Sequence, residues 1–419
     1  MVIEKPKLFL EKKDFVLFVL FMFCVISLRL FYTYQSYESF VSKPFYYTTA
    51  KVLNAYPKSR NGKTYTVLKL RSDGLTFFTS TYRNDALLGK DIRLKIYPTD
   101  RIGFIDYLGY FYVKSQIKNI ESTQTGTKDM LLKRVSVQHS NSEMASFYNA
   151  IFFASALSKE LREKIAGLGI SHLVALSGFH LGILWGLIYG ILLFLYKPFQ
   201  KRYFPYRFTL IDMGFLTIVL LGVYVWFVDF PPSLVRSYAM VLVGWIIVLL
   251  GMELLSFIFL TTIALLLLAL FPSLLVSLGF WLSVAGVFYI FLILQYSKEL
   301  KGWIISALLI PFGIFIFMLP VVHFIFGVTT VYQLLSPLLS LLFIPFYPLA
   351  MLLHIVGIGD LLDNGLLWLF GLSGETEEHI LPLSLFILYV GLSILAIWSK
   401  KVFYILLGMA LLYLVYLFV

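Results

Sequence analysis

The sequence predicts a membrane all-α polytopic bundle with a small all-β domain outside the membrane. Hydrophobic residues make up 59% of the 419 residues and charged residues only 14%, whereas soluble proteins are about half apolar and a quarter charged. Apolar stretches recur from Ser171 to Val419, each of roughly 17–25 residues and long enough to cross a bilayer core of about 30 Å. Residues 45–120 instead carry short runs of β-branched and aromatic residues.

Residues 1–44 are expected to form a cytoplasmic tail and an anchor helix. The apolar run 15–31 is longer than the core of a signal peptide, and no small-residue cleavage site follows it. Residues 1–13 carry four lysines against two glutamates, which places the N-terminus in the cytoplasm by the positive-inside rule. The single cysteine, Cys24, excludes a disulfide within the chain and a thiolate metal site.

Residues 45–120 are expected to form an OB-like domain on the extracytoplasmic (periplasmic) side. Five short strands suit a small barrel, and the OB-fold is the leading candidate. The turns between them are predicted at Pro57, Asn61-Gly62, Asp73-Gly74, Gly89 and Pro98. The expected strands are 47–54, 63–72, 75–82, 90–97 and 109–120.

Strand alternation gives this domain faces that combine aromatic and basic side chains. Residues 45–120 contain 13 Lys or Arg and 5 Asp, so they carry +8 of the net charge of +11. Such a face suits single-stranded nucleic acid, since bases stack on rings while cations follow phosphates. An ordinary solvated basic surface, or one facing anionic lipid headgroups, is the alternative. The DNA-binding candidates are Tyr65, Lys69, Arg71, Arg93, Lys95, Tyr97, Tyr110, Tyr112 and Lys114.

Residues 121–170 are expected to form a connector, polar at first and then amphipathic. Apolar residues at helical spacing between Phe147 and Leu168 lie opposite a charged face that includes Lys159 and Glu163. This pattern predicts a helix at the outer membrane–water interface.

Residues 171–419 are expected to form a polytopic membrane domain, bringing the total to about nine spanning helices plus a broken or re-entrant helical hairpin. The lysines and arginines between Lys197 and Arg207, and those at Lys298 and Lys301, indicate cytoplasmic loops. A single crossing of 329–357 would place the acidic loop 360–378 inside and Lys400 outside. A hairpin broken at its prolines would return the chain to the outer side, so that the loop 360–378 lies outside and Lys400 inside. The expected spans are 171–196, 209–228, 235–252, 255–271, 274–296 and 303–326.

The stretch 169–182 places two histidines and two serines at the end of an apolar helix. Ionisable residues within spans are costly and are functional candidates by default. Two alternatives remain: His172 and His180 as neutral packing residues, or Ser177 and His180 as a hydrolytic pair, which lacks an obvious orienting carboxylate. A metal site would require His323 or His354 as a further ligand. A ridge that permits close helix approach is predicted from Gly178, Gly182, Gly186 and Gly190.

Two further positions are candidates for lining a pore. Arg236 begins a spanning helix, where it either snorkels to the interface or forms a fixed cation at the mouth of an anion pathway. Trp281 and Ser283 lie near the start of a later span and carry a weaker signal, since a Trp there could simply pack.

Four elements of this sequence resemble motifs of the ComEC-type competence channel family. Residues 171–180, SHLVALSGFH, closely resemble that family's HLLAISGLH signature. Residues 232–240, PSLVRSYAM, are similar to its P-S-x-x-R-A-x-x-M element, and residues 280–285, FWLSVA, to its F-Q-L-S-F-A element. Residues 103–108, GFIDYL, resemble the stretch that ends the family's OB-like domain. The elements follow the family's order over most of residues 45–300.

This resemblance implies an inner-membrane channel that conducts single-stranded DNA into the cytoplasm during natural transformation. It also implies that the outer domain contacts DNA and that His172, Ser177, Gly178, His180, Gly182, Arg236, Trp281 and Ser283 belong to the channel motifs. The chain departs from the family at Trp281 and Ser237, where Gln and Ala are usual, and in having a single anchor helix before the outer domain. No H-x-H-x-D-H nuclease motif is present, so strand degradation is expected elsewhere.

We therefore expect a channel subunit and not an enzyme, with no cofactor and no metal. The sequence contains no G-x-x-x-x-G-K-[ST] loop, so energy is expected from a partner. The expected partners are single-stranded DNA, membrane lipid, an external DNA receptor and a cytoplasmic helicase-type ATPase, with a homo-oligomer possible. The competing hypotheses are an intramembrane Ser/His hydrolase or transferase, and a transporter of another anionic polymer.

Overall fold

A computed structural model describes residues 8–9, 11–60, 63–83, 87–121, 126–250, 256–372, 374 and 376–418. The predicted cytoplasmic lysines 5 and 7, the Asn61-Gly62 turn and the polar stretch 122–125 lie outside these residues. The chain divides into two compact units. The barrel unit comprises residues 9–130 and 262–278, and the bundle unit consists mainly of residues 131–261 and 279–419.

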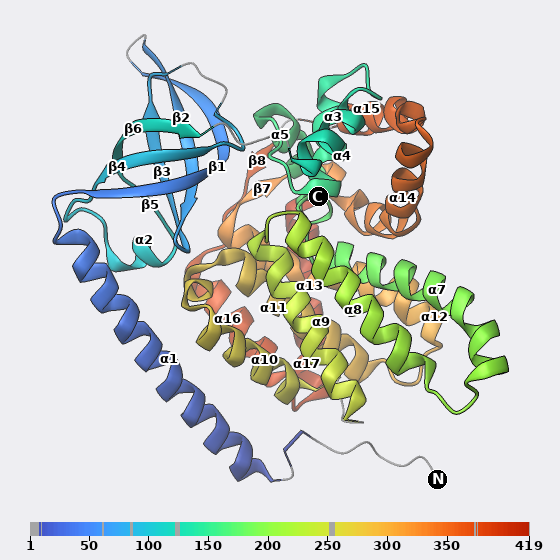
Figure 1. The fold of residues 1–419 in the computed structure, drawn as a ribbon. Helices are drawn as coiled ribbons and strands as arrows, with labels where there is room; N and C mark the ends of the chain where they lie inside the picture. The colour runs from blue at the N-terminus through green and yellow to red at the C-terminus, as the bar shows by residue number, and fades with distance from the viewer. Residues whose placement is uncertain are drawn as a thin grey trace. The chain divides into compact units, whose positions relative to one another are not determined.

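The barrel unit contains a six-stranded sheet in the order β5-β3-β2-β1-β4-β6 (Figure 1). Five strands were predicted. β2 has the predicted bounds, whereas β1 is longer than predicted because it bends at a bulge between Val52 and Asn54 and so pairs with both β4 and β2. The strands are β1 (Tyr46–Arg60), β2 (Lys63–Ser72), β3 (Leu75–Thr81), β4 (Asp91–Tyr97), β5 (Tyr110–Tyr112) and β6 (Lys114–Glu121).

The segment 110–121 closes this sheet on itself. β5 pairs with β3 in parallel, and β6 pairs with β4 antiparallel. Only Val113 separates the two strands, and its N–H donates to the carbonyl of Phe78 at 2.9 Å. Because β5 and β6 lie at the two ends of the strand order, one nearly continuous strand joins both edges and leaves a barrel without long free edges.

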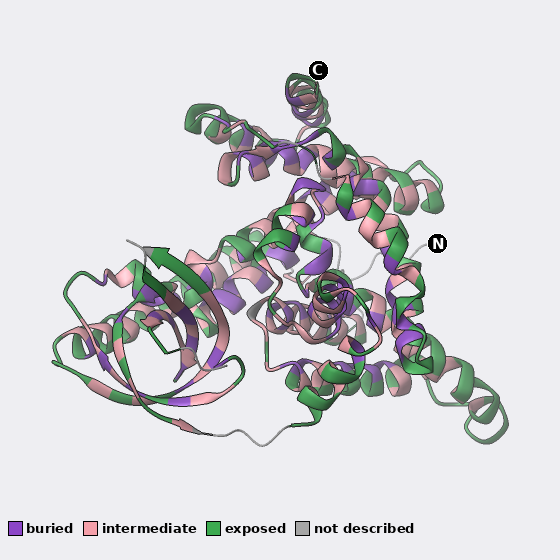
Figure 2. Cartoon of the chain, turned by 90° about the horizontal axis from the view of Figure 1, so that it is seen from above, coloured by how far each residue is buried: buried purple, intermediate pink, exposed green. Residues whose placement is uncertain are grey.

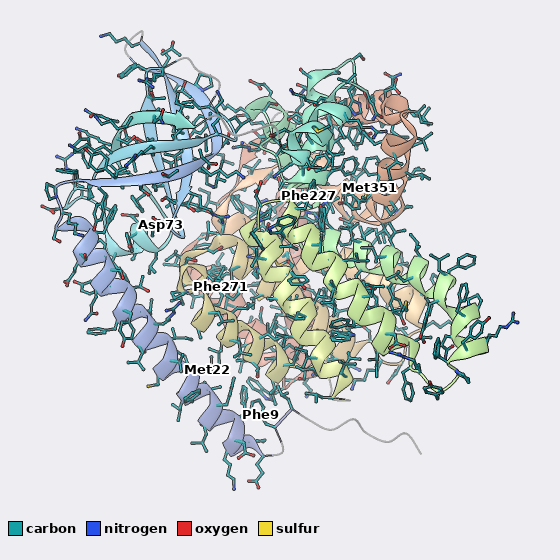
Figure 3. All side chains as sticks on the ribbon, in the orientation of Figure 1. Phe9, Met22, Asp73, Phe227, Phe271 and Met351 are labelled. Carbon is teal, nitrogen blue, oxygen red and sulfur yellow. The ribbon has the colours of Figure 1, made fainter. Side chains whose placement is uncertain are left out.

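Alternation along the strands fills the barrel with apolar side chains. The interior contains Leu68, Leu70, Phe77, Ile92 and Leu94, each no more than 2% exposed, while their neighbours along the strands face outward. The predicted β2–β3 turn has Asp73 at φ 48° (Figure 3) and Gly74 at φ 80°. Positive φ at both central residues is the geometry of a type I′ hairpin turn.

The anchor helix continues into the barrel unit. α1 spans Lys12–Val41, extending at both ends beyond the predicted apolar run. Its last turns pack onto the barrel, where the Tyr37 hydroxyl donates to the carbonyl of Ile102 at 2.8 Å and the Phe40 ring lies 5.5 Å from that of Tyr107. Tyr107 belongs to α2 (Phe104–Leu108), a short helix between β4 and β5. The GFIDYL element, residues 103–108, therefore connects the barrel to the anchor helix.

The bundle unit is built almost entirely from helices. Figure 1 labels most of them, and Figure 2 shows exposed residues over much of their outer surface. The helices after the barrel are α3 (Thr127–Ser136), α4 (Ser142–Phe153), α5 (Lys159–Gly167), α6 (Ser171–Val174), α7 (Gly178–Tyr203), α8 (Thr209–Phe227), α9 (Pro232–Leu249), α10 (Phe257–Leu270), α11 (Leu278–Tyr296), α12 (Gly302–Ile304), α13 (Ile310–Ile325), α14 (Ser336–Val356), α15 (Asp363–Gly371), α16 (Leu383–Leu395) and α17 (Lys400–Phe418). Short 3₁₀ segments are η1 (Pro272–Val276), η3 (Val331–Leu335) and η4 (Gly359–Leu362), and η2 (Ile305–Leu309) is a π-helical turn. β7 (Val328–Thr329) pairs with β8 (Glu377–Glu378).

Among the described residues, seven helical segments are long and apolar enough to cross a membrane. Three shorter apolar helices, 233–249, 257–270 and 383–395, accompany them. Large apolar side chains such as Phe194, Leu195 and Trp226 are exposed on these segments. Exposed apolar surface of this extent requires a lipid environment, so the chain is a multi-pass membrane protein.

The break predicted at the prolines of 329–357 is absent, and the chain returns only after α15, where β8 pairs with β7. η3 and α14 form one helical segment from Val331 to Val356. Pro337 occupies the first turn, where its missing N–H costs nothing, and Pro345 and Pro348 are accommodated inside the helix. The helix ends at Gly357 with φ 93°. The chain then enters α15, whose nine residues are too few to span a bilayer at about 1.5 Å per residue.

The connector forms several short helices instead of one. α4 ends where Ala154 adopts a left-handed conformation at φ 58°, and α5 restarts at the Ser158 cap, whose hydroxyl accepts from the Leu161 N–H. The predicted apolar face is confirmed, since Phe147 and Leu161 are buried. It packs on protein, however: the Phe147 ring lies 5.3 Å from that of Phe370 on α15.

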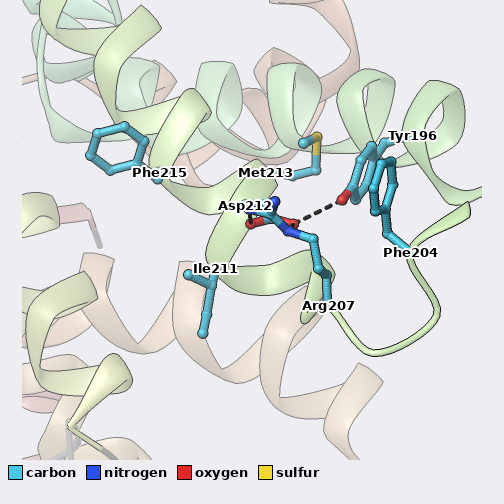
Figure 4. A pocket seen from close by; sticks show the side chains of 7 residues that line it. All are labelled: Tyr196, Phe204, Arg207, Ile211, Asp212, Met213 and Phe215. Carbon is cyan, nitrogen blue, oxygen red and sulfur yellow. Dashed lines mark hydrogen bonds and ion pairs between the residues drawn. The ribbon is translucent and has the colours of Figure 1, made fainter. Parts of the chain in front are cut away.

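An ion pair closes the turn between α7 and α8 (Figure 4). Arg207 donates from Nε and Nη2 to the two carboxylate oxygens of Asp212 at 2.8 and 2.7 Å. The Tyr196 hydroxyl donates to the same carboxylate at 2.8 Å. Phe204, Ile211, Met213 and Phe215 complete the lining of a depression of about 440 Å³. All polar groups in this depression are engaged with one another, so we assign it to turn stability.

Candidate functional site

The SHLVALSGFH stretch forms a break between two helices and not the start of one span. α6 ends at Val174, and α7 begins at Gly178. Ser177 has extended backbone angles and caps α7, because its hydroxyl accepts from the Phe179 N–H at 3.3 Å. The predicted span from 171 therefore starts seven residues later, since a serine cap competes with helix continuation.

Ser177 and His180 form the reciprocal contacts of a helix cap. The Ser177 N–H donates to His180 Nδ1 at 3.3 Å, which occupies the only lone pair of that nitrogen. The Ser177 hydroxyl donates to the His172 carbonyl at 3.3 Å and lies 3.5 Å from His180 Nδ1. A general base needs its lone pair aimed at the nucleophile, whereas here the backbone holds it.

The far side of His180 is buried against aromatic rings. Its ring lies 5.1 Å from that of Phe343 and 5.0 Å from that of Tyr347, both on α14. With Nδ1 accepting, the neutral ring carries its hydrogen on Nε2. This atom has no hydrogen-bond partner among the described residues. The arrangement matches the predicted alternative of a neutral, packed histidine.

The motif at residues 171–180 packs against the motif at residues 232–240 through small side chains. The Ser233 hydroxyl donates to the Leu176 carbonyl at 2.6 Å, and the Ser237 hydroxyl donates to the Ser233 carbonyl at 2.9 Å. A Cβ atom on Gly178 would lie 2.9 Å from Ser237 Oγ. Gly178 thus brings the start of α7 against the first turns of α9, so the predicted close approach holds at this glycine.

Arg236 joins the second motif to the third. It is 8% exposed, and its guanidinium carbon lies 6.0 Å from the centre of the Phe280 ring on α11. Its Nε atom has no hydrogen-bond partner among the described residues. This buried position differs from a snorkelling arginine. Trp281, at 47% exposure, and the half-buried Ser283 lie on the same stretch of α11.

Two of the remaining ridge glycines, Gly182 and Gly186, line an open groove. Nothing in the described structure lies within 4 Å of a Cβ placed on Gly182, Gly186 or Gly190, so close packing within the chain is wrong for these three. The groove has a volume of about 570 Å³. It is lined by Gly178, Phe179, Gly182, Ile183, Gly186 and Leu187 of α7 and by Ile344 and Pro348 of α14. His172, which is exposed, contacts Ser340 of α14 at 3.3 Å.

The barrel brings several predicted DNA-binding residues together around Lys95. Its Nζ atom lies 3.9 Å from the ring centre of Phe45, 5.2 Å from that of Tyr97 and 5.8 Å from that of Tyr47. Tyr47 is directly opposite Lys95 in the β1–β4 register. We call Phe45, Tyr47, Lys95 and Tyr97 the Lys95 cluster. The exposed Arg93 and Lys114 adjoin it, because Lys114 pairs with Tyr97.

A second cluster lies on β2, β3 and β5. Lys69 Nζ is 4.4 Å from the ring centre of Tyr110 and 6.0 Å from that of Phe78. Phe78 pairs with Tyr112, whose hydroxyl bonds to that of Ser80 at 2.8 Å. We call Lys69, Phe78, Tyr110 and Tyr112 the Lys69 cluster.

Two predicted residues lie apart from both clusters, and three members of the clusters were not predicted. Arg71 is half-buried and pairs with Lys51 across β1 and β2. The Tyr65 ring centre lies 6.2 Å from that of Tyr82, and Tyr65 belongs to neither cluster. Sequence reasoning missed Tyr47 and Phe78, because only the cross-strand register places them beside the lysines. It also missed Phe45, which precedes β1 and meets Lys95 through the fold.

The other two membrane histidines are engaged elsewhere. His323 contacts the Leu319 carbonyl and the Thr329 hydroxyl at 3.0 and 2.9 Å. His354 contacts His139 at 3.0 Å, together with Asp363 in a cluster that the sequence did not predict. Across the described ranges, no group of three or more His, Cys, Asp or Glu side chains could hold a metal.

The geometry thus defines a multi-pass membrane protein whose motif residues meet at the start of two helices. Comparison with family models matches residues 153–417 to the Competence protein family, over well more than half of the chain. The chain belongs to this family, as its motifs predicted. A search of curated proteins and a search of solved structures gave no match. Family membership associates the chain with DNA uptake during competence.

Proposed function

We propose that this chain conducts single-stranded DNA across the inner membrane during natural transformation. Family membership carries the proposal. The strand order and closure through residues 110–121 support an OB-like assignment for the barrel. The Lys95 and Lys69 clusters support DNA as its ligand, because each combines exposed rings with a cation.

Helix contacts support the proposed orientation of the bundle. The Gln295 amide donates to the Ile397 carbonyl at 2.8 Å, which brings the end of α11 next to the α16–α17 turn. Lys298 and Lys400 therefore share one end of the bundle. The opposite end holds the acidic loop, since β8 in this loop pairs with β7, which follows the end of α13 away from Lys301. The positive-inside rule assigns the lysine end to the cytoplasm.

Within this function we assign Arg236 the role of a fixed cation beside the conducting path. A buried guanidinium over an aromatic ring is costly in a membrane and is retained where an anion must pass. Ser177 and His180 are assigned to helix capping and not to catalysis, because the backbone occupies His180 Nδ1. An external DNA receptor and a cytoplasmic helicase-type ATPase supply delivery and energy.

Gene deletion in a transformable strain tests this function. We expect transformation by added DNA to fall below detection and to return with the wild-type gene. Binding of labelled duplex DNA at the cell surface should persist, while labelled DNA in the cytoplasm should disappear. Transformation by electroporation, which bypasses the channel, is the control and should be unchanged. An unaltered frequency of natural transformation in the deletion strain would overturn the proposal.

A further inference from the structure

A buried chain of hydrogen bonds links the connector to the two helices after it. His139, in the turn after α3, contacts the Asp363 carboxylate at 2.8 Å through Nδ1. Its Nε2 atom lies 3.0 Å from Nε2 of His354, in the last turn of α14. His354 Nδ1 lies 2.7 Å from the Ala350 carbonyl. The three side chains are each no more than 9% exposed.

The atoms in this chain fix the number of hydrogens that it needs. A carbonyl only accepts, so His354 carries a hydrogen on Nδ1. The contact between His139 and Asp363 requires a second hydrogen, and the Nε2–Nε2 contact requires a third. Two neutral imidazoles supply only two. Without one more proton, two nitrogen lone pairs would face each other at 3.0 Å and the carboxylate would be buried uncompensated.

We propose that His139, His354 and Asp363 form a proton-binding site that locks the connector onto the end of α14. One extra proton is shared along the chain, between a carboxylate and two imidazoles, so the closed cluster is neutral overall. The site is independent of the proposed channel function, because it follows from hydrogen-bond geometry alone.

The surroundings of the cluster favour a closed, dry site. The Tyr148 ring stacks on His139 with centres 4.7 Å apart, and it lies 4.4 Å from the His354 ring. Burial raises the pKa of the Tyr148 hydroxyl, which therefore stays neutral. Of the charged residues nearest in sequence, Glu143 on α4 pairs with Lys164 at 2.9 Å, while Arg134 on α3 and Asp360 on η4 are exposed.

The Gln138 side chain adds two hydrogen bonds that hold the connector to the end of α14. Its amide nitrogen donates to the His354 carbonyl at 3.1 Å, and its amide oxygen accepts from the Gly359 N–H at 2.9 Å. Opening of the cluster would free both ends of this clamp. α14 is also the helix that supplies Ile344 and Pro348 to the groove, so the lock fixes one end of a groove-lining helix.

The direction of the pH effect follows from the proton count. Above about pH 7.5 isolated histidines are neutral, so the open form holds one proton fewer than the closed form. Raising the pH then favours opening by up to about tenfold per pH unit. At acidic pH the open form gains protons on both histidines, and this also favours opening. The lock is therefore tightest near neutral pH.

Hydrogen exchange of the full-length protein in detergent tests the site. After correction for intrinsic exchange rates, protection of the Gly359 amide should fall by up to about tenfold between pH 7.5 and 8.5. In His354→Gln the side-chain amide donates to His139 without an added proton, so protection should become independent of pH. His323→Gln is the matched control. Its contacts need only a neutral ring, and it should keep the wild-type pH dependence.

A second measurement keeps the inference testable if His354→Gln does not fold. ¹⁵N solid-state NMR of wild-type protein should show one proton shared between the two Nε2 atoms at pH 7.5. Two unprotonated Nε2 atoms would overturn the proposal, as would wild-type protection that does not change with pH. Loss of protection on adding EDTA would also overturn it, because a metal ion would then occupy the proton's place.

Discussion

The contact between Gly178 and Ser237 offers the sharpest test of how the channel motifs interlock. A Cβ atom on Gly178 would lie 2.9 Å from Ser237 Oγ and 3.3 Å from Ser237 Cβ. Ser237 cannot simply rotate away, because its hydroxyl donates to the Ser233 carbonyl at 2.9 Å. We therefore expect Gly178→Ala to destabilise the protein by about 1–3 kcal/mol through overpacking. Ser237→Ala removes the closer atom and should restore much of this loss.

Thermal unfolding of detergent-solubilised protein measures the effect. Gly182→Ala is the matched control, because nothing in the described structure lies within 4 Å of its added Cβ, and we expect a change within about 1 kcal/mol. The double variant Gly178→Ala/Ser237→Ala should be more stable than the two single effects predict, by about 1 kcal/mol or more. Equal stability of the Gly178 and Gly182 variants, or strict additivity in the double variant, would refute the reasoning.

Three further changes probe the proposed function. Lys95→Gln should weaken binding of single-stranded DNA and lower the slope of log affinity against log salt by about 0.7 if one phosphate contact is lost. Lys133→Gln, an exposed lysine outside the barrel unit, should leave the slope unchanged, and equal slopes for both variants would remove Lys95 from the DNA path. Arg236→Met should retain thermal stability, since replacing a buried cation by an apolar side chain is often neutral, yet abolish transformation in complemented cells. Normal transformation would exclude Arg236 from the conducting path. Ser177→Ala should lower stability by about 1 kcal/mol through loss of the cap and keep measurable transformation, whereas complete loss of function in a folded variant would favour the hydrolase hypothesis.

Local pattern predicted the strands well, because strand alternation and turn residues are encoded within a few positions. The Asp73-Gly74 turn and the bounds of β2 follow directly from such signals. Closure of the barrel does not follow from such local signals. It depends on one segment, 110–121, pairing with two distant strands in opposite senses, and residue propensities carry no information on partner strands.

The same limit explains the outcome at the barrel surface. Alternation identified Lys95 and Tyr97 on an outward face, but Tyr47 joins them only through its register on β1. Phe45 precedes that strand, so strand alternation gives no position for it. Cross-strand neighbours set the composition of a sheet surface, so a face read from single strands recovers some members of each cluster and misses their partners.

Helix breaks in the bundle were predicted less well than apolar lengths. Three prolines in 329–357 suggested a broken hairpin, yet the helix continues to Val356. The real break lies at Ala175–Ser177, where no proline or glycine interrupts the sequence. In a membrane, neighbouring groups compensate the hydrogen bonds that a proline removes. A serine cap with a reciprocal histidine instead starts a new helix, α7, and so separates it from α6.

The motifs that resemble those of the competence channel family mainly hold helix starts together, and this changes the role assigned to most of their residues. Ser233 holds the Leu176 carbonyl, Gly178 admits Ser237, and the next contact places Arg236 over Phe280. Within this chain of contacts, the serines and the histidine satisfy backbone groups that a helix start would otherwise leave unpaired. Among the described motif residues, His180 Nε2 and Arg236 Nε are both buried donors without a hydrogen-bond partner, and of the two only Arg236 is always charged. A motif rich in polar side chains can therefore be mainly structural, and we propose that its buried cation, Arg236, is the member that serves conduction.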